Sequence, residues 1–199
     1  PPRSTQSRSS AASDVYKRQG QKESGIEEGI IKGGYLFYRG KKKSKDFSVH
    51  LLGSGSIMNQ VLLARDLLEK MGIPTNIWSI TSYIELQREA LSIEANNRRG
   101  VSVNAEPYIK QLFKNENGIF VAATDYMASL PQGIAAWMPQ GFEVLGTDGY
   151  GLSESRPTLR KHFEVDSYSI AKTALLGLGR KEHLSPEQVG AYLQKLESV

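Results

Sequence analysis

The stretch FSVHLLGSGSIMNQVLLARDLLEKMGIPTNIWSI, residues 47–80, contains an apolar run, a helical pattern and a second apolar run. Residues 47–52 and 76–80 have the length and apolar content of strands. Between them, one face of a helix is marked by apolar residues at helical spacing: Ile57, Val61, Ala64, Leu68 and Met71. Two strands joined through a helix pair in parallel, with a right-handed crossover. The stretch therefore predicts an α/β fold built on a parallel sheet.

The alternation of strands and helices continues on both sides of this unit. Further strands are predicted over residues 35–38, 119–123 and 142–145, the last of them buried. Further helices are predicted over residues 83–98, 107–113, 130–138 and 168–180, with a final one beginning at Ser185. We expect a three-layer αβα sandwich with a mostly parallel sheet. The first of these strands would run antiparallel at one edge, because the lysine-rich turn over residues 41–45 is too short for a crossover.

Local patterns allow sharper expectations for individual elements. The apolar members of the 83–98 helix are Ile84, Leu86, Leu91 and Ile93. Ser167 is expected to cap the helix that follows it, and Ser185 with Gln188 forms a capping box for the final helix. Residues 27–32 are interpreted as a lead into the first strand.

Composition and charge narrow the classes of partner. The sequence pI is about 9.2 and the net charge is +4, but residues 1–24 contribute +3 through five basic and two acidic side chains. The remainder is nearly neutral, which argues against a nucleic-acid partner. No apolar run reaches membrane-spanning length, and the absence of cysteine excludes disulfides and thiolate metal sites. We therefore expect a cytoplasmic protein without a nucleic-acid or membrane partner.

A second informative stretch is FEVLGTDGYGLSESRPTLRKHFEVD, residues 142–166. Three glycines interrupt a polar loop directly after a predicted strand, and open α/β sheets place ligands at such carboxyl ends. The residues that could shape a domain interface or an active-site entrance are Asp148, Tyr150, Ser153, Arg156 and His162. The alternative is a polar connection, in which Asp148 and Glu154 pair with Arg156 and Arg160 to fix the loop.

Other patterns that could carry chemistry are weak. Residues 53–58 begin like a dinucleotide fingerprint, but the third glycine is missing and no acid ends the next strand. The histidines His50, His162 and His183 lie in separate segments without a carboxylate at ligand spacing, which argues against a metal site. Neither a P-loop lysine nor the serine elbow of hydrolases is present.

A family resemblance is carried by the strings VHLLGSGSI (49–57), WSITSYIEL (78–86), PYI (107–109), ATDYM (123–127), VLGTDGYGLSESR (144–156) and LRKHFEVD (159–166). Together they resemble the C-terminal domain of the homodimeric decarboxylating component of the pyruvate dehydrogenase complex. That component belongs to a transketolase-like, thiamine-diphosphate-dependent family. The likeness extends over most of the chain, so it is far more specific than a short motif.

The resemblance implies a parent enzyme that oxidatively decarboxylates pyruvate with thiamine diphosphate and acetylates the lipoyl group of the acetyltransferase component. The last domain of such an enzyme shapes the homodimer and packs against the upstream catalytic domains. We accordingly divide the chain into three parts. They are a disordered or non-native leader over residues 1–20, a linker and edge strand over 21–46, and a transketolase C-terminal-like domain over 47–199.

The cofactor-anchoring motif of the family is absent from the sequence. The family holds the cofactor phosphates through a magnesium ion bound by a Gly-Asp-Gly string and a later asparagine. Here the nearest string, residues 146–149, has one extra residue, and no asparagine follows Asn117. We therefore assign no catalytic, cofactor-binding or metal-binding residue to this chain. Thiamine diphosphate and magnesium are expected in the parent enzyme, and the isolated chain is expected to be inactive.

Two alternatives stay open. The parent could be a transketolase or another 2-oxo-acid dehydrogenase, because a fold alone does not select the substrate. The chain could instead be a free-standing, non-enzymatic interaction module. In the family, a Trp-Asn string followed by Leu-His-Pro is usual where this chain has NNRRGVS, residues 96–102. The contacts that this loop makes in the family are therefore not carried over to this chain.

Overall fold

The computed structural model describes residues 26–41, 47–102 and 104–198 of the chain. The predicted leader over residues 1–20 lies outside the described residues, and so does most of the lysine-rich turn. The three-part division of the chain therefore stays a prediction.

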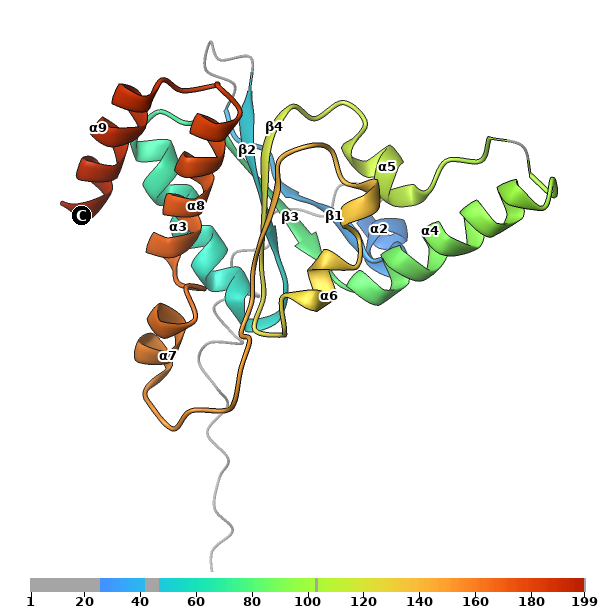
Figure 1. Cartoon of the computed structure of the whole chain (residues 1–199), viewed down its shortest axis with the longest axis horizontal. Coiled ribbons are helices and arrows are strands. Elements are labelled where there is room, and N and C mark those ends of the chain that lie inside the picture. Colours follow the sequence, from blue (N-terminus) through green and yellow to red (C-terminus); the bar gives the residue numbers. More distant parts are fainter. Residues whose placement is uncertain (1–25, 42–46, 103, 199) are drawn as a thin grey trace, which may run out of the picture.

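A five-stranded sheet with the strand order β1-β3-β2-β4-β5 lies at the centre of the described structure (Figure 1). The strands are β1 (Gly34–Tyr38), β2 (Ser48–Gly53), β3 (Thr75–Ile80), β4 (Gly118–Ala123) and β5 (Phe142–Leu145). β2 pairs in parallel with β3 and β4, and β4 pairs in parallel with β5. β1 pairs antiparallel with β3 at the edge. The predicted mostly parallel sheet with one antiparallel edge strand is confirmed.

Helices cover both faces of the sheet, so the predicted three-layer sandwich is also confirmed (Figure 1). One face is covered by α3 (Met58–Lys70), α8 (Ser167–Arg180) and α9 (Pro186–Glu197). The other face is covered by α4 (Tyr83–Arg98), α5 (Tyr108–Phe113), α6 (Ser129–Gln132) and the 3-10 helix η2 (Ala135–Trp137). The remaining elements are α2 (Ile26–Lys32), which packs beside β1, the 3-10 turn η1 (Gly55–Ile57) and α7 (Arg156–His162).

Side-chain alternation along β2 divides the core between the two faces. Val49 and Leu51 pack toward α3 and α8, whereas His50 and Leu52 point to the other face, and all four side chains are fully buried. Successive residues of a strand point to opposite faces, so a central strand of a covered sheet is buried on both sides. The core residues predicted for α8 are confirmed as fully buried: Ile170, Ala174, Leu175 and Leu178.

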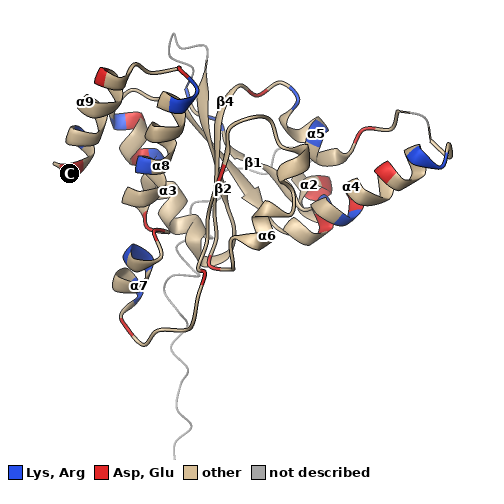
Figure 2. Ribbon diagram, in the orientation of Figure 1, with Lys and Arg blue, Asp and Glu red and all other residues tan. Residues whose placement is uncertain are grey.

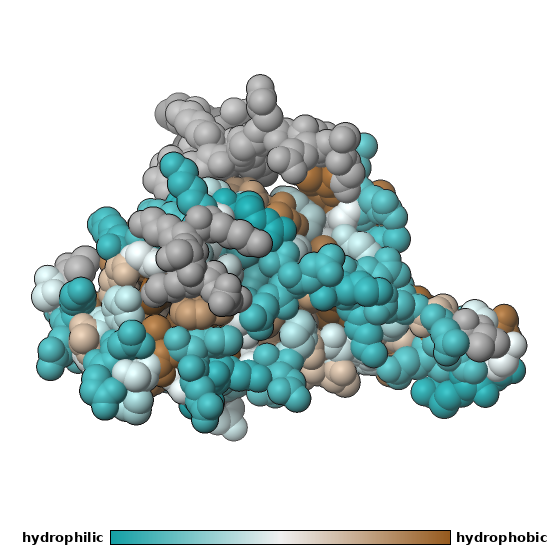
Figure 3. Space-filling view, turned by 90° about the horizontal axis from the view of Figure 1, so that it is seen from above, coloured by the Kyte–Doolittle hydropathy of each residue, from teal (hydrophilic) through white to brown (hydrophobic). Residues whose placement is uncertain are grey.

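Helix α4 has the predicted bounds, and Leu86 is the fully buried one of its four apolar members named above. Ile84 and Leu91 are 60% and 48% exposed, and the buried residues of the helix are Tyr83, Leu86 and Ala90. Ile84 and Leu91 are seven residues apart, so they share a face of the helix that lies beside the buried face. Figures 1 and 3 also show that α4 projects beyond the sheet as an arm. The surface of this arm is mostly hydrophilic (Figure 3). The apolar residues of α4 are therefore divided between a buried face and an exposed one.

Three other elements also differ from the sequence prediction. Residues 27–32 belong to helix α2 and are not merely a lead into β1. The helix predicted over residues 130–138 is broken into the short elements α6 and η2 around Gly133, because glycine disfavours a continuous helix. β5 was predicted to be buried, but it is half-buried since it is an edge strand with a neighbour on one side only.

The caps of the last two helices were predicted with mixed success. Asp166, not Ser167, caps α8, because its carboxylate accepts a hydrogen bond from the Ser169 N–H at 3.0 Å. The capping box of Ser185 and Gln188 at the start of α9 is confirmed.

Candidate ligand-binding site at the carboxyl end of the sheet

A cavity of about 420 Å³ opens at the carboxyl ends of the parallel strands. Ile57 follows β2, Asp125 follows β4 and Thr147 follows β5, and all three residues line the cavity. Leu159 and Phe163 line it from the side of α7, which lies below the lower edge of the sheet in Figure 1. This is the edge at which open α/β sheets place ligands.

Hydrogen bonds hold the glycine loop that follows β5 against the end of β4. Thr147 Oγ1 donates to the Asp125 carbonyl oxygen at 2.7 Å, and Thr147 N donates to the Tyr126 carbonyl oxygen at 2.8 Å. The Asp148 carboxylate accepts from the Ala128 N–H at 3.0 Å. These contacts make the start of the loop a fixed part of the cavity wall.

The turn after β2 brings a hydroxyl group to a carboxylate at the cavity. Ser56 Oγ donates to Asp125 Oδ2 at 2.9 Å, and both residues line the cavity. Gly55 has a φ of +53°, and a Cβ atom there would lie 3.0 Å from Asp125 Oδ1. Glycine therefore allows the turn to approach the carboxylate. Behind it, Ser54 Oγ donates to Thr124 Oγ1 at 2.8 Å, which ties the ends of β2 and β4 together.

Helix α7 contributes two arginines to the cavity. Ser155 caps this helix through its side chain, and Arg156 and Arg160 line the cavity one helical turn apart. The ribbon of α7 is coloured blue at its basic residues in Figure 2. Neither arginine takes part in an ion pair within the described part of the chain. The predicted pairing of Asp148 and Glu154 with these arginines is therefore wrong.

The five predicted site residues have different positions in the structure. Tyr150 and Arg156 line the cavity, and Tyr150 is 95% exposed. Asp148 accepts the backbone hydrogen bond that holds the loop. Ser153 and His162 are not among the residues that line the cavity. A role of these residues at a domain interface or an active-site entrance stays a prediction.

Sequence reasoning did not identify Ser56 and Asp125 as site residues. Both lie within three residues of the carboxyl end of a strand of the parallel sheet, and such positions converge at one edge. That rule, applied to β2 and β4 as well as to β5, would have found them.

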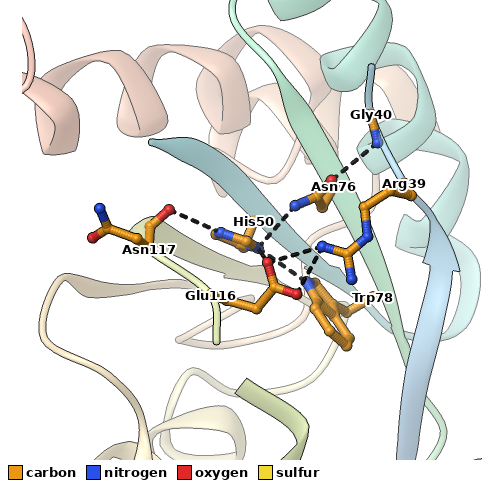
Figure 4. A network of polar contacts seen from close by, with 7 residues as sticks. All are labelled: Arg39, Gly40, His50, Asn76, Trp78, Glu116 and Asn117. Atoms are coloured by element: carbon orange, nitrogen blue, oxygen red, sulfur yellow. Dashed lines mark hydrogen bonds and ion pairs between the residues drawn. The ribbon is translucent and has the colours of Figure 1, made fainter. Parts of the chain in front are cut away.

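A second polar cluster lies near the amino ends of β2 and β4, opposite the cavity (Figure 4). Its centre is the fully buried His50, whose Nδ1 accepts from Trp78 Nε1 at 3.2 Å. His50 Nε2 lies 3.2 Å from the Asn117 carbonyl oxygen, so Nε2 carries the ring proton and donates it. Arg39 Nη1 lies 2.7 and 3.0 Å from the two carboxylate oxygens of Glu116, which joins the first strand to the loop before β4.

Burial keeps His50 neutral at pH 7. It lowers the pKa of His50 to about 4, although the hydrogen bond to Asn117 acts in the opposite direction. The ring also stacks on Phe120, with 4.4 Å between the ring centroids. Both ring nitrogens are engaged and the side chain is fully buried, so this cluster joins strands and has no open face for a ligand.

The cavity does not have the donor set that a magnesium-bound diphosphate needs. In the described ranges no group of three or more His, Asp or Glu side chains is arranged to hold a metal ion. Asp125 is the carboxylate in the lining, and it already accepts from Ser56. Magnesium prefers octahedral coordination by hard oxygen atoms, which this lining does not supply. The residues present therefore do not fit thiamine diphosphate with its metal ion.

Comparison with known proteins places this geometry in a family. Residues 33–166 match the family described as the transketolase-like TK C-terminal domain. The chain belongs to this family. The transketolase C-terminal-like chain is 38% identical over 174 residues to the pyruvate dehydrogenase E1 component of Pseudomonas aeruginosa, covering 86% of the chain and 20% of the relative. It is 36% identical over 176 residues to the component of that name in Escherichia coli, covering 86% and 19%.

A solved structure supports the fold of this transketolase C-terminal-like chain. A transketolase mutant from Pichia stipitis in complex with xylulose 5-phosphate matches with a TM-score of 0.52 and 17% identity, over 78% of this chain and 19% of that one. The resemblance drawn from the sequence is confirmed, and the chain spans about a fifth of the length of its curated relatives. None of the helices that the structure describes is both long and apolar enough to cross a membrane.

Proposed function

We propose that the chain is the C-terminal, dimer-supporting lobe of a pyruvate dehydrogenase decarboxylating component in the cytoplasm. The observation that carries this proposal is the 38% identity to the Pseudomonas aeruginosa E1 component over 86% of the chain. The parent enzyme oxidatively decarboxylates pyruvate with thiamine diphosphate and magnesium, and acetylates the lipoyl group of the acetyltransferase component. The partners of the lobe are the upstream catalytic domains, a second copy of the enzyme and that acetyltransferase.

The chemistry of the described residues supports a lobe whose reactive centre lies in other polypeptide. Asp125, the carboxylate of the cavity lining, accepts a hydrogen bond from Ser56, and both ring nitrogens of the buried His50 are engaged in hydrogen bonds. A general base must reach the proton that it abstracts, and a neutral imidazole closed off between strands does not. We accordingly expect the isolated chain to be inactive on pyruvate.

The test is to determine the coding sequence upstream of Gly20 and to express the complete reading frame. The proposal expects an in-frame Gly-Asp-Gly string followed by an asparagine, and a protein that decarboxylates pyruvate in the presence of thiamine diphosphate and magnesium. A product that transfers ketol groups between sugar phosphates would identify a transketolase instead. A start codon near Gln21 would identify a free-standing module, and either result would contradict the proposal.

A further inference from the structure

The cavity at the carboxyl end of the sheet has a distinct combination of charge and apolar surface. Arg156 and Arg160 lie on successive turns of α7, so their Cα atoms are separated by about 6 Å along the helix axis. Neither has an acidic partner within the described residues. Guanidinium groups bind carboxylate and phosphate oxygens through paired, charge-assisted hydrogen bonds. Two of them at one cavity make a binding surface for an oxyanion.

The negative charge of one carboxylate at the cavity does not neutralise the positive charge of the two arginines. Asp125 is the acidic residue of the lining, and its Oδ2 accepts the Ser56 hydroxyl at 2.9 Å. Two arginines and one aspartate leave the lining with a net charge of 2 − 1 = +1. Ser56 therefore orients the carboxylate, while both arginines are free of acidic partners among the described residues.

The rest of the lining is suited to an apolar or aromatic body. Ile57 and Val165 are buried to 2% and 1% exposure, and Leu159 and Phe163 of the α7 wall are half-buried. Tyr150 adds an exposed aromatic ring. The volume of about 420 Å³ falls in the range of roughly 300–1,000 Å³ that is typical of small-molecule sites.

The rim of the cavity is open on the side of the glycine loop. A Cβ atom added at Gly149 or at Gly151 would meet no heavy atom within 4 Å. The loop therefore leaves room for a ligand to enter next to the arginines, whereas the start of the loop is fixed by Thr147 and Asp148.

We propose that this cavity binds a small organic anion, namely a carboxylate or phosphate monoester that carries an aromatic or acyl body. The oxyanion contacts Arg156 and Arg160, and the body packs on Phe163 and the apolar floor. This site goes beyond the proposed function and does not depend on it, because the residues that form it all belong to this chain.

The experiment is a titration of the isotope-labelled chain with phenyl phosphate, followed by two-dimensional NMR. We expect chemical-shift changes at Gly149, Gly151 and the first turn of α7, with a dissociation constant of about 1 mM or tighter. Inorganic phosphate lacks the body and benzyl alcohol lacks the charge, so each should bind at least about tenfold more weakly. Equal affinity for benzyl alcohol, or shifts confined to another surface, would overturn the proposal.

Matched variants separate the role of the arginines from general effects of charge. Arg156→Gln and Arg160→Gln should each weaken the binding of phenyl phosphate by about tenfold, and the double variant should abolish it. Arg99→Gln removes an equal charge at the exposed end of α4, and it should leave the affinity unchanged. The unfolding midpoint of each variant shows that it is folded. Unchanged affinity in the folded double variant contradicts the proposal.

A last measurement separates a small molecule from an acidic side chain as the source of the oxyanion. A structure of the complete reading frame with phenyl phosphate should show the phosphate group on Arg156 and Arg160. A structure in which carboxylates of other segments of the polypeptide occupy both arginines would overturn the site in favour of a contact between domains.

Discussion

The polar groups at the two ends of the parallel sheet differ in their surroundings. At the amino end, His50 is fully buried and both of its ring nitrogens are engaged. At the carboxyl end, Arg156 and Arg160 face a cavity of about 420 Å³ without an acidic partner in the described residues. Buried polar groups stabilise a fold when they are satisfied, whereas unpaired charges at a cavity are available to a ligand. We therefore assign the amino end to stability and the carboxyl end to binding.

The largest difference between the two ends should appear in glycine substitutions. Gly118 at the amino end has a φ of +132°, and a Cβ atom there would lie 1.9 Å from the Ser48 carbonyl oxygen. Gly118→Ala combines this clash with backbone strain, so it should lower the free energy of unfolding by about 4 kcal/mol. Gly149 has a φ of +115° but nothing within 4 Å of such a Cβ atom, so Gly149→Ala should cost about 1 kcal/mol. Urea unfolding at pH 7 measures both, and equal losses would contradict the contrast.

Acid should destabilise the amino end through His50. The pKa of His50 is lowered from 6.5 to about 4, so in acid the unfolded chain binds the proton more tightly than the folded chain. The contribution to stability is complete above about pH 6.5 and is lost as the pH falls toward 4, by about 3 kcal/mol in the free energy of unfolding. Urea unfolding at several values between pH 7 and pH 4 measures how steeply the free energy of unfolding falls with pH.

A matched pair of histidine variants isolates the contribution of His50 from that of the carboxylates. His50→Gln should be less stable at pH 7 but should lose less of its remaining stability in acid. His162→Gln changes an exposed histidine and should keep the slope of the parent chain. If the free energy of unfolding of His50→Gln depended on pH as steeply as that of the parent chain, His50 would not be the source of the acid sensitivity.

Removing the ion pair of the amino-end cluster should have a smaller effect. Glu116 is 12% exposed and pairs with Arg39, whose side chain is 49% exposed and can be rehydrated. Glu116→Gln should therefore lower the free energy of unfolding by about 1 kcal/mol. Glu106→Gln breaks the more exposed ion pair with Lys114, and it should change the free energy of unfolding by less than about 0.5 kcal/mol. Thermal unfolding compares the stability of the two variants. A larger loss of stability in Glu106→Gln than in Glu116→Gln would contradict a structural role for the cluster.

The smallest effect on stability is expected at the cavity. Ser56→Ala removes the hydrogen bond to Asp125 at the open carboxyl end, where water can replace it. We expect the free energy of unfolding to fall by less than about 1 kcal/mol. Because the freed Asp125 carboxylate could turn toward the arginines, the affinity for phenyl phosphate should fall in the same variant. A large loss of stability with unchanged affinity would reverse the roles given to the two ends.

Local patterns in the sequence were sufficient to predict the framework of the fold. The strand–helix–strand unit over residues 47–80 predicted the parallel pairing of β2 and β3, and the short turn before it predicted the antiparallel β1. The apolar residues of α4 did not identify its buried face, because Ile84 and Leu91 are exposed whereas Tyr83, Leu86 and Ala90 are buried. The sequence of one helix alone does not show which of its faces packs on the sheet.

The candidate site was predictable only in part. The glycine loop pointed to the correct edge of the sheet, and Tyr150 and Arg156 do line the cavity. Asp148 was expected to pair with an arginine, but it accepts a hydrogen bond from the Ala128 N–H. Ser56 joins the site from a turn 69 residues away from Asp125 in sequence, so their contact depends on the packing of β2 against β4. Such long-range contacts are not encoded in a local pattern.

The central claim is that the chain supports a reactive centre located in other polypeptide. The direct test is to assay the purified chain with pyruvate, thiamine diphosphate and magnesium, and to follow the release of carbon dioxide. The account predicts no turnover by the chain alone, and turnover by the complete reading frame under the same conditions. Thiamine-dependent release of carbon dioxide by the chain alone would contradict it.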